Sequence, residues 1–218
     1  MSWQYRVRLQ DDSGPGKYHG PMLTDRLARQ VAFLLEADKL KSIVRRTPIA
    51  DNSRLENSAE HSWHLALAAM ALEEYAPAGT DLMRVIRMLV VHDLVEVDAG
   101  DTFAYDLTAQ DSKADRERLA ADRLFGLLPP DQAPELRALW EEFEAQDTPS
   151  ARYANALDRF QPLLLNMESG GGSWVHHGVP RDQVMRRMAP VREWMPRCWP
   201  YVQDVIDRAC AAGLIRTD

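Results

Sequence analysis

The helical spacing of apolar residues constrains the fold of this chain more than any other feature of the sequence. From residue 22 onward, apolar side chains recur at intervals of three and four residues, which places them on one face of an α-helix. No run alternates apolar and polar residues convincingly over the length of a strand. We therefore predict an all-α fold, with helices at 57–76, 80–92, 113–128, 132–146, about 181–188 and about 199–212, and one from Thr148-Pro149 to the glycines at 170–172.

Residues that favour helix ends bound several of these segments. Asn57 followed by Glu60 resembles a capping box, in which side chains satisfy the first free N–H groups of a helix. Thr148 before Pro149 is typical of an N-cap followed by a proline at the first helical position. The glycines at 170–172 lack the Lys-Ser/Thr pair of a phosphate-binding P-loop, so we interpret them as a helix stop and a flexible turn.

The length of the chain and the position of its glycines and prolines indicate the domain organisation. A chain of 218 residues suits one compact domain with a sizeable core. We predict a short irregular N-terminal segment at 1–20, with an extended stretch at 3–9, before a single domain over 21–218. One long stretch without helical spacing remains, at roughly 97–111, and such loops in compact domains are often functional.

Charge and cysteine content argue against several classes of protein. The formal net charge of −7 disfavours a nucleic-acid polymer as partner, because Lys and Arg contacts to phosphates supply most of that affinity. A small nucleotide bound by one or two local cations is still compatible with this charge. The two cysteines, Cys198 and Cys210, cannot form a disulfide framework, and no window reaches the ~18 apolar residues of a membrane span. We expect a cytoplasmic protein that does not bind a membrane.

Three separate segments place a histidine or an aspartate beside an apolar stripe. In VVHDLVEVDAG, His92 and Asp93 end an apolar run, where a buried charge needs a partner or a metal. His61 and His64 in NSAEHSWH lie one helical turn apart, and Asp158 lies in the apolar segment ALDRFQPLL. Taken singly, such residues are more often hydrogen-bonded core histidines, polar helix faces or carboxylates paired with arginines. Taken together, they suggest one metal site.

The residue types indicate the chemistry that such a site would support. Histidine and carboxylate together suit a borderline-to-hard divalent ion such as Mn, Fe, Co or Zn. No cysteine lies near the three segments, which argues against a structural zinc site. A site of this kind can leave a coordination position open, and a metal-bound water there can hydrolyse a substrate.

The order of these residues matches a known family signature. His61, then His92-Asp93, then Asp158 resembles the H…HD…D signature of the HD-domain metal-dependent phosphohydrolases. The segments RRTPIADNSRLENSAEHSWH, VVHDLVEVDAGDTFAYD and YANALDRFQPLL resemble bacterial members of the 5′-deoxynucleotidase-like branch, and the resemblance covers roughly residues 25 to 210. It implies a helical HD-domain bundle in which His61, His92, Asp93 and Asp158 bind one divalent metal ion, be it Mn, Co, Fe, Zn or Mg.

The resemblance also implies two catalytic carboxylates near the metal. Glu96 matches the acidic residue one turn beyond the HD pair, and it would orient or deprotonate the attacking water. Helical geometry supports this role, because Glu96 follows His92 by four residues and Asp93 by three. Asp101 matches the acidic residue that contacts the sugar or the leaving group. Asp98 has no role that the resemblance assigns.

Substrate recognition is expected to depend on the segment before the first histidine. Arg46 lies fifteen residues before His61, where nucleotidase relatives have a phosphate-binding arginine, and Lys41 or Arg45 would assist it. Thr47 occupies the position of a tryptophan that helps the deoxynucleotidase to exclude the 2′-hydroxyl group, which leaves selectivity for deoxynucleotides open. His64 is expected not to be a ligand.

These inferences lead to one main hypothesis and two alternatives. The main hypothesis is a phosphomonoesterase acting on nucleoside or deoxynucleoside 5′-monophosphates, and the resemblance suggests a homodimer. The first alternative keeps the metal site but changes the substrate to a nucleoside triphosphate, a cyclic nucleotide or a phosphorylated metabolite. The second is a non-catalytic module that binds metal or nucleotide for regulation. Trp174, Trp194 and Trp199 would either line a base pocket or make packing and dimer contacts.

Overall fold

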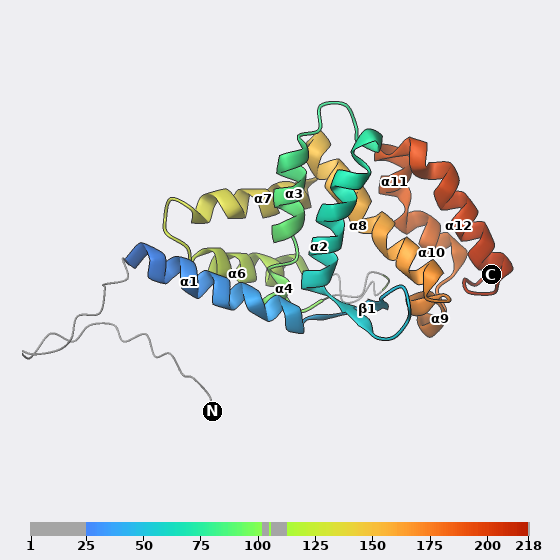
Figure 1. Cartoon of the computed structure of the whole chain (residues 1–218), viewed down its shortest axis with the longest axis horizontal. Coiled ribbons are helices and arrows are strands. Elements are labelled where there is room, and N and C mark those ends of the chain that lie inside the picture. Colours follow the sequence, from blue (N-terminus) through green and yellow to red (C-terminus); the bar gives the residue numbers. More distant parts are fainter. Residues whose placement is uncertain (1–24, 102–104, 106–112, 218) are drawn as a thin grey trace, which may run out of the picture.

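A computed structural model describes residues 25–101, 105 and 113–217, and most of these residues are helical (Figure 1). The all-α prediction is confirmed. The expected N-terminal segment at 1–20, with its extended stretch, lies outside the described residues. The helices are α1 (Asp25–Ala37), α2 (Ser58–Ala71), α3 (Leu82–Val91), α4 (Glu96–Ala99), α6 (Lys113–Phe125), α7 (Ala133–Ala145), α8 (Pro149–Glu168), α9 (Gly172–His177), α10 (Arg181–Arg187), α11 (Ala189–Trp194) and α12 (Trp199–Ala211), with 3-10 turns η1 (Asp38–Ser42), η2 (Glu73–Tyr75) and η3 (Pro196–Cys198).

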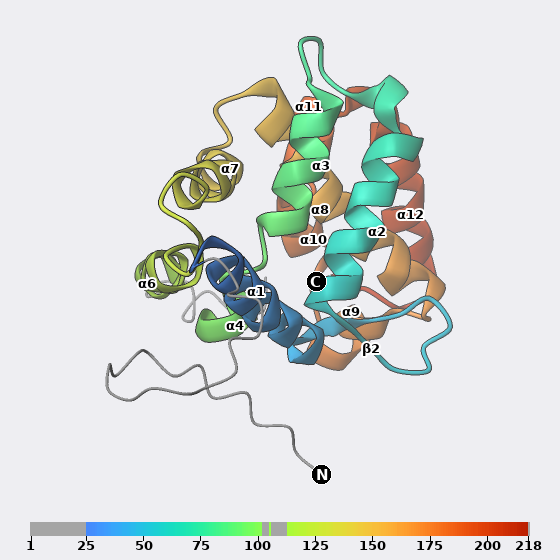
Figure 2. The ribbon, with the colours of Figure 1, turned by 60° about the vertical axis from the view of Figure 1, so that its left-hand side comes forward.

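Three helices form the centre of the molecule. Helices α2 and α3 lie side by side, and α8 packs against both of them (Figures 1 and 2). Helices α6 and α7 lie on one side of this group, and α10, α11 and α12 lie on the other. Leu65, Leu89 and Leu157, one from each central helix, are completely buried between them. Among the described helices, none is both long and apolar enough to cross a membrane.

The predicted helix starts at Asn57 and Thr148 are confirmed. The Asn57 side chain accepts a hydrogen bond from the backbone N–H of Glu60, and the Glu60 carboxylate accepts one from the backbone of Asn57. Thr148 accepts a hydrogen bond from the backbone of Ala151 at the start of α8. These side chains satisfy N–H groups that have no partner within the helix, and each cap contributes about 1 kcal/mol.

Two short strands depart from the uniformly helical expectation. Strand β1 (Val44–Pro48) pairs antiparallel with β2 (Leu55–Asn57), and the register is irregular between its ends. Strands of five and three residues are too short to show a clear alternation of apolar and polar residues. Helix α4 is a second difference, because it occupies part of the loop that was predicted at 97–111, most of which lies outside the described residues.

The triple glycine ends α8 and joins it closely to α9. All three glycines adopt positive φ angles, of 76°, 99° and 39°, which residues with a Cβ atom rarely adopt. A Cβ atom at Gly172 would lie 2.7 Å from Asn166 Oδ1 and 2.8 Å from Pro48 Cγ. The expected helix stop is therefore confirmed, and Gly172 also allows the start of α9 to pack against β1.

This packing predicts a specific cost for a side chain at Gly172. We expect Gly172→Ala to lower the free energy of unfolding by roughly 1–3 kcal/mol more than Gly170→Ala, because it overpacks a tight contact. Gly170 is a matched control, since its φ angle is also positive but a Cβ there would meet nothing within 4 Å. Urea unfolding curves of the two variants would measure the difference, and equal losses would contradict the steric explanation.

Candidate functional site

Two histidines and an aspartate from the three central helices meet at one buried point. His61 lies on α2, His92 follows the last residue of α3, and Asp158 lies in the middle of α8. The Oδ1 atom of Asp158 is 2.8 Å from His61 Nε2 and 3.9 Å from His92 Nε2. One ligand atom of each residue lies within 4.8 Å of the other two. The helix packing thus brings together three of the four predicted metal ligands.

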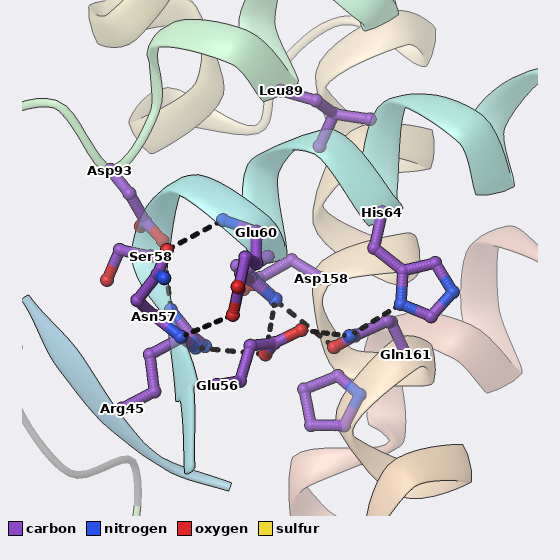
Figure 3. A network of polar contacts seen from close by, with 12 residues as sticks. Arg45, Glu56, Asn57, Ser58, Glu60, His64, Leu89, Asp93, Asp158 and Gln161 are labelled. Atoms are coloured by element: carbon purple, nitrogen blue, oxygen red, sulfur yellow. Dashed lines mark hydrogen bonds and ion pairs between the residues drawn. The ribbon is translucent and has the colours of Figure 1, made fainter. Parts of the chain in front are cut away.

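A chain of hydrogen bonds orients the His61 ring. Glu56 on β2 accepts a hydrogen bond from Gln161 Nε2 at 2.8 Å, so the amide oxygen of Gln161 faces His61 Nδ1 at 3.1 Å (Figure 3). Because that oxygen only accepts, Nδ1 carries a proton, and Nε2, which faces Asp158, either carries a second proton or, once that proton is lost, can bind a metal. Gln161 Nε2 also lies 3.1 Å from His64 Nδ1, and His64 is not one of the three residues whose ligand atoms meet.

His92 is oriented in the same way. Its Nδ1 atom lies 2.9 Å from the backbone carbonyl oxygen of Leu89, which can only accept a hydrogen bond. Its Nε2 atom is buried and has no hydrogen-bond partner among the described residues, although Asp93 Oδ1 is 3.1 Å away. These two nitrogen atoms and the Asp158 carboxylate are the ligands expected for a borderline divalent ion. We call His61, His92 and Asp158 the donor set. The residues present therefore fit a metal.

Asp93, the fourth predicted ligand, lies beside this donor set. Its Oδ2 atom accepts a hydrogen bond from Arg45 Nη1 at 2.9 Å (Figure 3). Arg45 also lies near Glu56, with Nε 3.7 Å from Oε2. Burial lowers the pKa of Arg45, but Asp93 and the other nearby carboxylates outweigh this effect and raise it above its usual range. Arg45 is thus a structural counter-ion of the acidic residues at the site.

Electrostatic interactions favour the charged forms of His61 and Asp158 despite burial, whereas burial lowers the pKa of His92. Burial and Arg45 lower the pKa of His61, but hydrogen bonds with Asp158 and Glu56 outweigh them and raise it to about 9. Burial would raise the pKa of Asp158, yet Arg159 and the two histidines hold it well below its usual range. A proton on His61 therefore balances the carboxylates when no cation is bound, and a metal at the same point would displace it.

Glu96 lies next to the donor set at the start of α4. Its side chain is buried, and its Oε2 atom accepts a hydrogen bond from Ser58 Oγ at 2.6 Å. Burial, followed by the nearby charge of Asp93, raises the pKa of Glu96 to about 9, although Arg45 acts in the opposite direction. A proton therefore stays on Glu96 at neutral pH unless a cation beside it lowers its pKa, and the carboxylate that results is suited to accepting a proton from water.

A cavity of about 170 Å³ opens beside these residues. Asp93, Glu96 and Asp158 form part of its wall, whereas His61 and His92 are buried and are not among its lining residues. The other charged and polar side chains in the wall include Arg45, Arg46, Thr47, Asp101, Tyr105, Arg159 and Arg187, together with the ring of Trp174. A cavity that combines clustered carboxylates with four arginines can hold a cation and an anion together.

The remaining predicted site residues divide between the cavity and the surface. Arg46 and Thr47 lie on β1 and line the cavity, and Asp101 lines it as well. Lys41 does not line it: the side chain is exposed and forms an ion pair with Asp38. Asp98, which had no expected role, accepts a hydrogen bond from Arg123 at 2.9 Å and so links α4 to α6.

The three C-terminal tryptophans have different environments. Trp174 is 2% exposed and its ring forms part of the cavity wall. The Arg152 guanidinium lies 4.3 Å from the ring of Trp194, and that of Arg192 lies 6.0 Å from the ring of Trp199. Trp174 alone is therefore placed to meet a ligand, and the other two make cation–π contacts.

Sequence reasoning missed Glu56, Gln161 and Arg187. Gln161 follows Asp158 by three residues, and this helical spacing could have indicated a shared face of α8. The role of Glu56 depends on the pairing of two short strands, and that of Arg187 on the packing of α10 against the cavity. Neither leaves a periodic signal in the sequence.

Known proteins resemble this chain in sequence and in structure. It is similar to 5′-deoxynucleotidase HDDC2 from Homo sapiens, with 31% identity over 137 residues, which are 62% of this chain and 66% of that protein. The protein of the same name from Xenopus laevis is also 31% identical, over 62% of this chain and 68% of its own length. The match thus spans just under two thirds of the human relative.

Two solved structures share the fold. A predicted metal-dependent phosphohydrolase from Magnetospirillum magnetotacticum MS-1 is 50% identical, with a TM-score of 0.85 over 90% of this chain and 98% of that one. A conserved hypothetical protein from Pyrococcus furiosus is 20% identical, with a TM-score of 0.56 over 83% and 99% of the two chains, and supports the fold alone. The family model for the HD domain matches residues 37–199, and the chain therefore belongs to the HD domain family.

Proposed function

We propose that this protein is a metal-dependent phosphomonoesterase that acts on nucleoside or deoxynucleoside 5′-monophosphates. The observation that supports this most is the meeting of His61, His92 and Asp158 at one buried point, with Asp158 on the wall of a cavity that four arginines also line. The names of the similar proteins, a 5′-deoxynucleotidase and a predicted metal-dependent phosphohydrolase, are consistent with this activity.

His61, His92 and Asp158, with Asp93 beside them, would hold one divalent cation. When bound, such a cation acts as a Lewis acid towards phosphate and lowers the pKa of water. Glu96 would accept the proton of the attacking water, and Ser58 fixes the position of its carboxyl group by the 2.6 Å hydrogen bond. Asp101, on the cavity wall, would contact the sugar or the leaving group.

Arg46 and Thr47 would contact the substrate from β1. Arg46 is exposed at the cavity and makes no ion pair with a described residue, so its guanidinium is available for phosphate oxygens. Thr47 is buried in the wall, and its side chain is much smaller than the tryptophan that the family resemblance implies at this position. The space beside Thr47 would then admit a 2′-hydroxyl group.

Metal content provides a first test. We expect His61→Ala to weaken binding of Mn²⁺ at least about tenfold, because it removes a ligand, whereas His64→Ala retains most of the affinity. The two histidines lie one turn apart on the same helix, so His64→Ala controls for general damage to α2. Titration calorimetry with Mn²⁺ would measure both affinities, and equal losses would contradict the assignment of His61.

Turnover provides a second test. With the metal-loaded protein, we expect phosphate release directly from nucleoside monophosphates. We expect Glu96→Ala to lower kcat by roughly 10²- to 10⁴-fold at unchanged metal content, because the proton acceptor is lost. A colorimetric phosphate assay across a panel of nucleotides would measure both. Release only from triphosphates, or only after a coupled phosphatase is added, would instead support a different substrate, and full activity of Glu96→Ala would refute its role.

Selectivity for the sugar provides a third test. We expect kcat/KM for dAMP and AMP to agree within about tenfold, because Thr47 offers no bulky group to reject the 2′-hydroxyl. Steady-state rates with both nucleotides at several concentrations would give the ratio. A preference for dAMP of a hundredfold or more would show that another residue excludes the hydroxyl group.

A further inference from the structure

Arg187 differs from the other partly buried arginines of the cavity, Arg45 and Arg159, because it has no carboxylate partner among the described residues; Arg46 also lacks one, but Arg46 is exposed. It is the last residue of α10, its side chain is partly buried, and it lines the cavity. Arg45 forms an ion pair with Asp93, Arg159 with Asp158, and the neighbouring Arg186 with Asp182. Within the described part of the chain, Arg187 has neither an ion pair nor a hydrogen bond.

The environment of Arg187 is unfavourable for a positive charge. Burial lowers the pKa of Arg187 to about 9, and the nearby guanidinium of Arg159 is the second cause. At neutral pH Arg187 is still charged, so two like charges lie close together in a partly desolvated cavity. Asp158 and Tyr105 offset only part of this effect. An anion in the cavity would remove the remaining cost.

The position of Arg159 indicates where that anion would lie. Arg159 contacts Asp158 Oδ2, while Oδ1 of the same carboxylate faces the two histidines. Arg159 therefore lies on the Oδ2 side of Asp158, and Arg187 lines the same cavity near Arg159 and Asp158. We propose that Arg187, together with Arg159, binds the non-bridging oxygens of the phosphate group that reacts. The identity of the anion as the reacting phosphate group rests on the proposed function, whereas anion binding by Arg187 does not.

Binding of inorganic phosphate, the expected product, tests this assignment without turnover. With the Mn²⁺-loaded protein, we expect Arg187→Gln to raise the Kd of phosphate by about ten- to a hundredfold, because charged hydrogen bonds are lost. Arg186→Gln is the matched control, since Arg186 is exposed on the same helix and pairs with Asp182, and its Kd should equal that of the wild type. Equal affinity of the Arg187→Gln variant and the wild type would overturn the proposal.

Thermal stability separates anion binding from a structural role. Without phosphate, we expect Arg187→Gln to have a Tm equal to or above that of the wild type, because it removes an uncompensated charge. Phosphate should then raise the Tm of the wild type and of Arg186→Gln but not that of Arg187→Gln. A lower Tm of Arg187→Gln without phosphate, together with an undiminished rise on adding phosphate, would show that the arginine only supports the fold.

Kinetics distinguish failure of this inference from failure of the proposed function. Arg187→Gln should raise KM for nucleoside monophosphates and lower kcat/KM at unchanged metal content, and Arg187→Lys should recover part of the loss. If no nucleotide is hydrolysed but phosphate binding still depends on Arg187, the anion site stands and the proposed activity fails. If nucleotides are hydrolysed with wild-type kcat/KM by Arg187→Gln, the activity stands and the anion site fails.

Discussion

The carboxylate of Asp158 lies in the middle of α8 between the buried side chains of Leu157 and Phe160. Burying an ion in this way costs several kcal/mol unless its charge is compensated. Here the compensation comes from His61, which donates to Oδ1 when it carries a proton there, and from Arg159, which contacts Oδ2. The packing of α2 against α8 and the buried charge therefore depend on one another.

The small β1–β2 hairpin positions two charged side chains beside the donor set. Strands β1 and β2 bring Arg45 and Glu56 to the edge of the donor set from a direction that no central helix reaches (Figure 3). Arg45 balances Asp93, and Glu56 fixes the amide of Gln161 and through it the ring of His61. Such outer residues hold metal-binding side chains in one orientation, which a flexible loop would do less well.

The sequence predicts the helices and the donor set better than it predicts their surroundings. Helical spacing and the caps at Asn57 and Thr148 are local signals, so they can be recognised in the sequence without knowledge of the fold. The contact of Asp98 with Arg123 and the place of Arg187 in the cavity wall depend on how distant segments pack. The sequence places Lys41 near Arg46, but the turn η1 directs its side chain to Asp38 and away from the cavity. Local patterns contain no information about such packing.

The charge of the cavity provides an argument about the substrate. Among the described residues, four arginines and four carboxyl groups line the cavity, so their formal charges cancel when Glu96 is ionised, as its role as a base requires. A divalent cation at the donor set would leave two positive charges, and a phosphate monoester, which is close to a dianion at neutral pH, would neutralise both. A phosphodiester brings one negative charge and a triphosphate brings more than two. The charge balance therefore favours a monoester, and it accounts for two cavity arginines, Arg46 and Arg187, that have no carboxylate partner among the described residues.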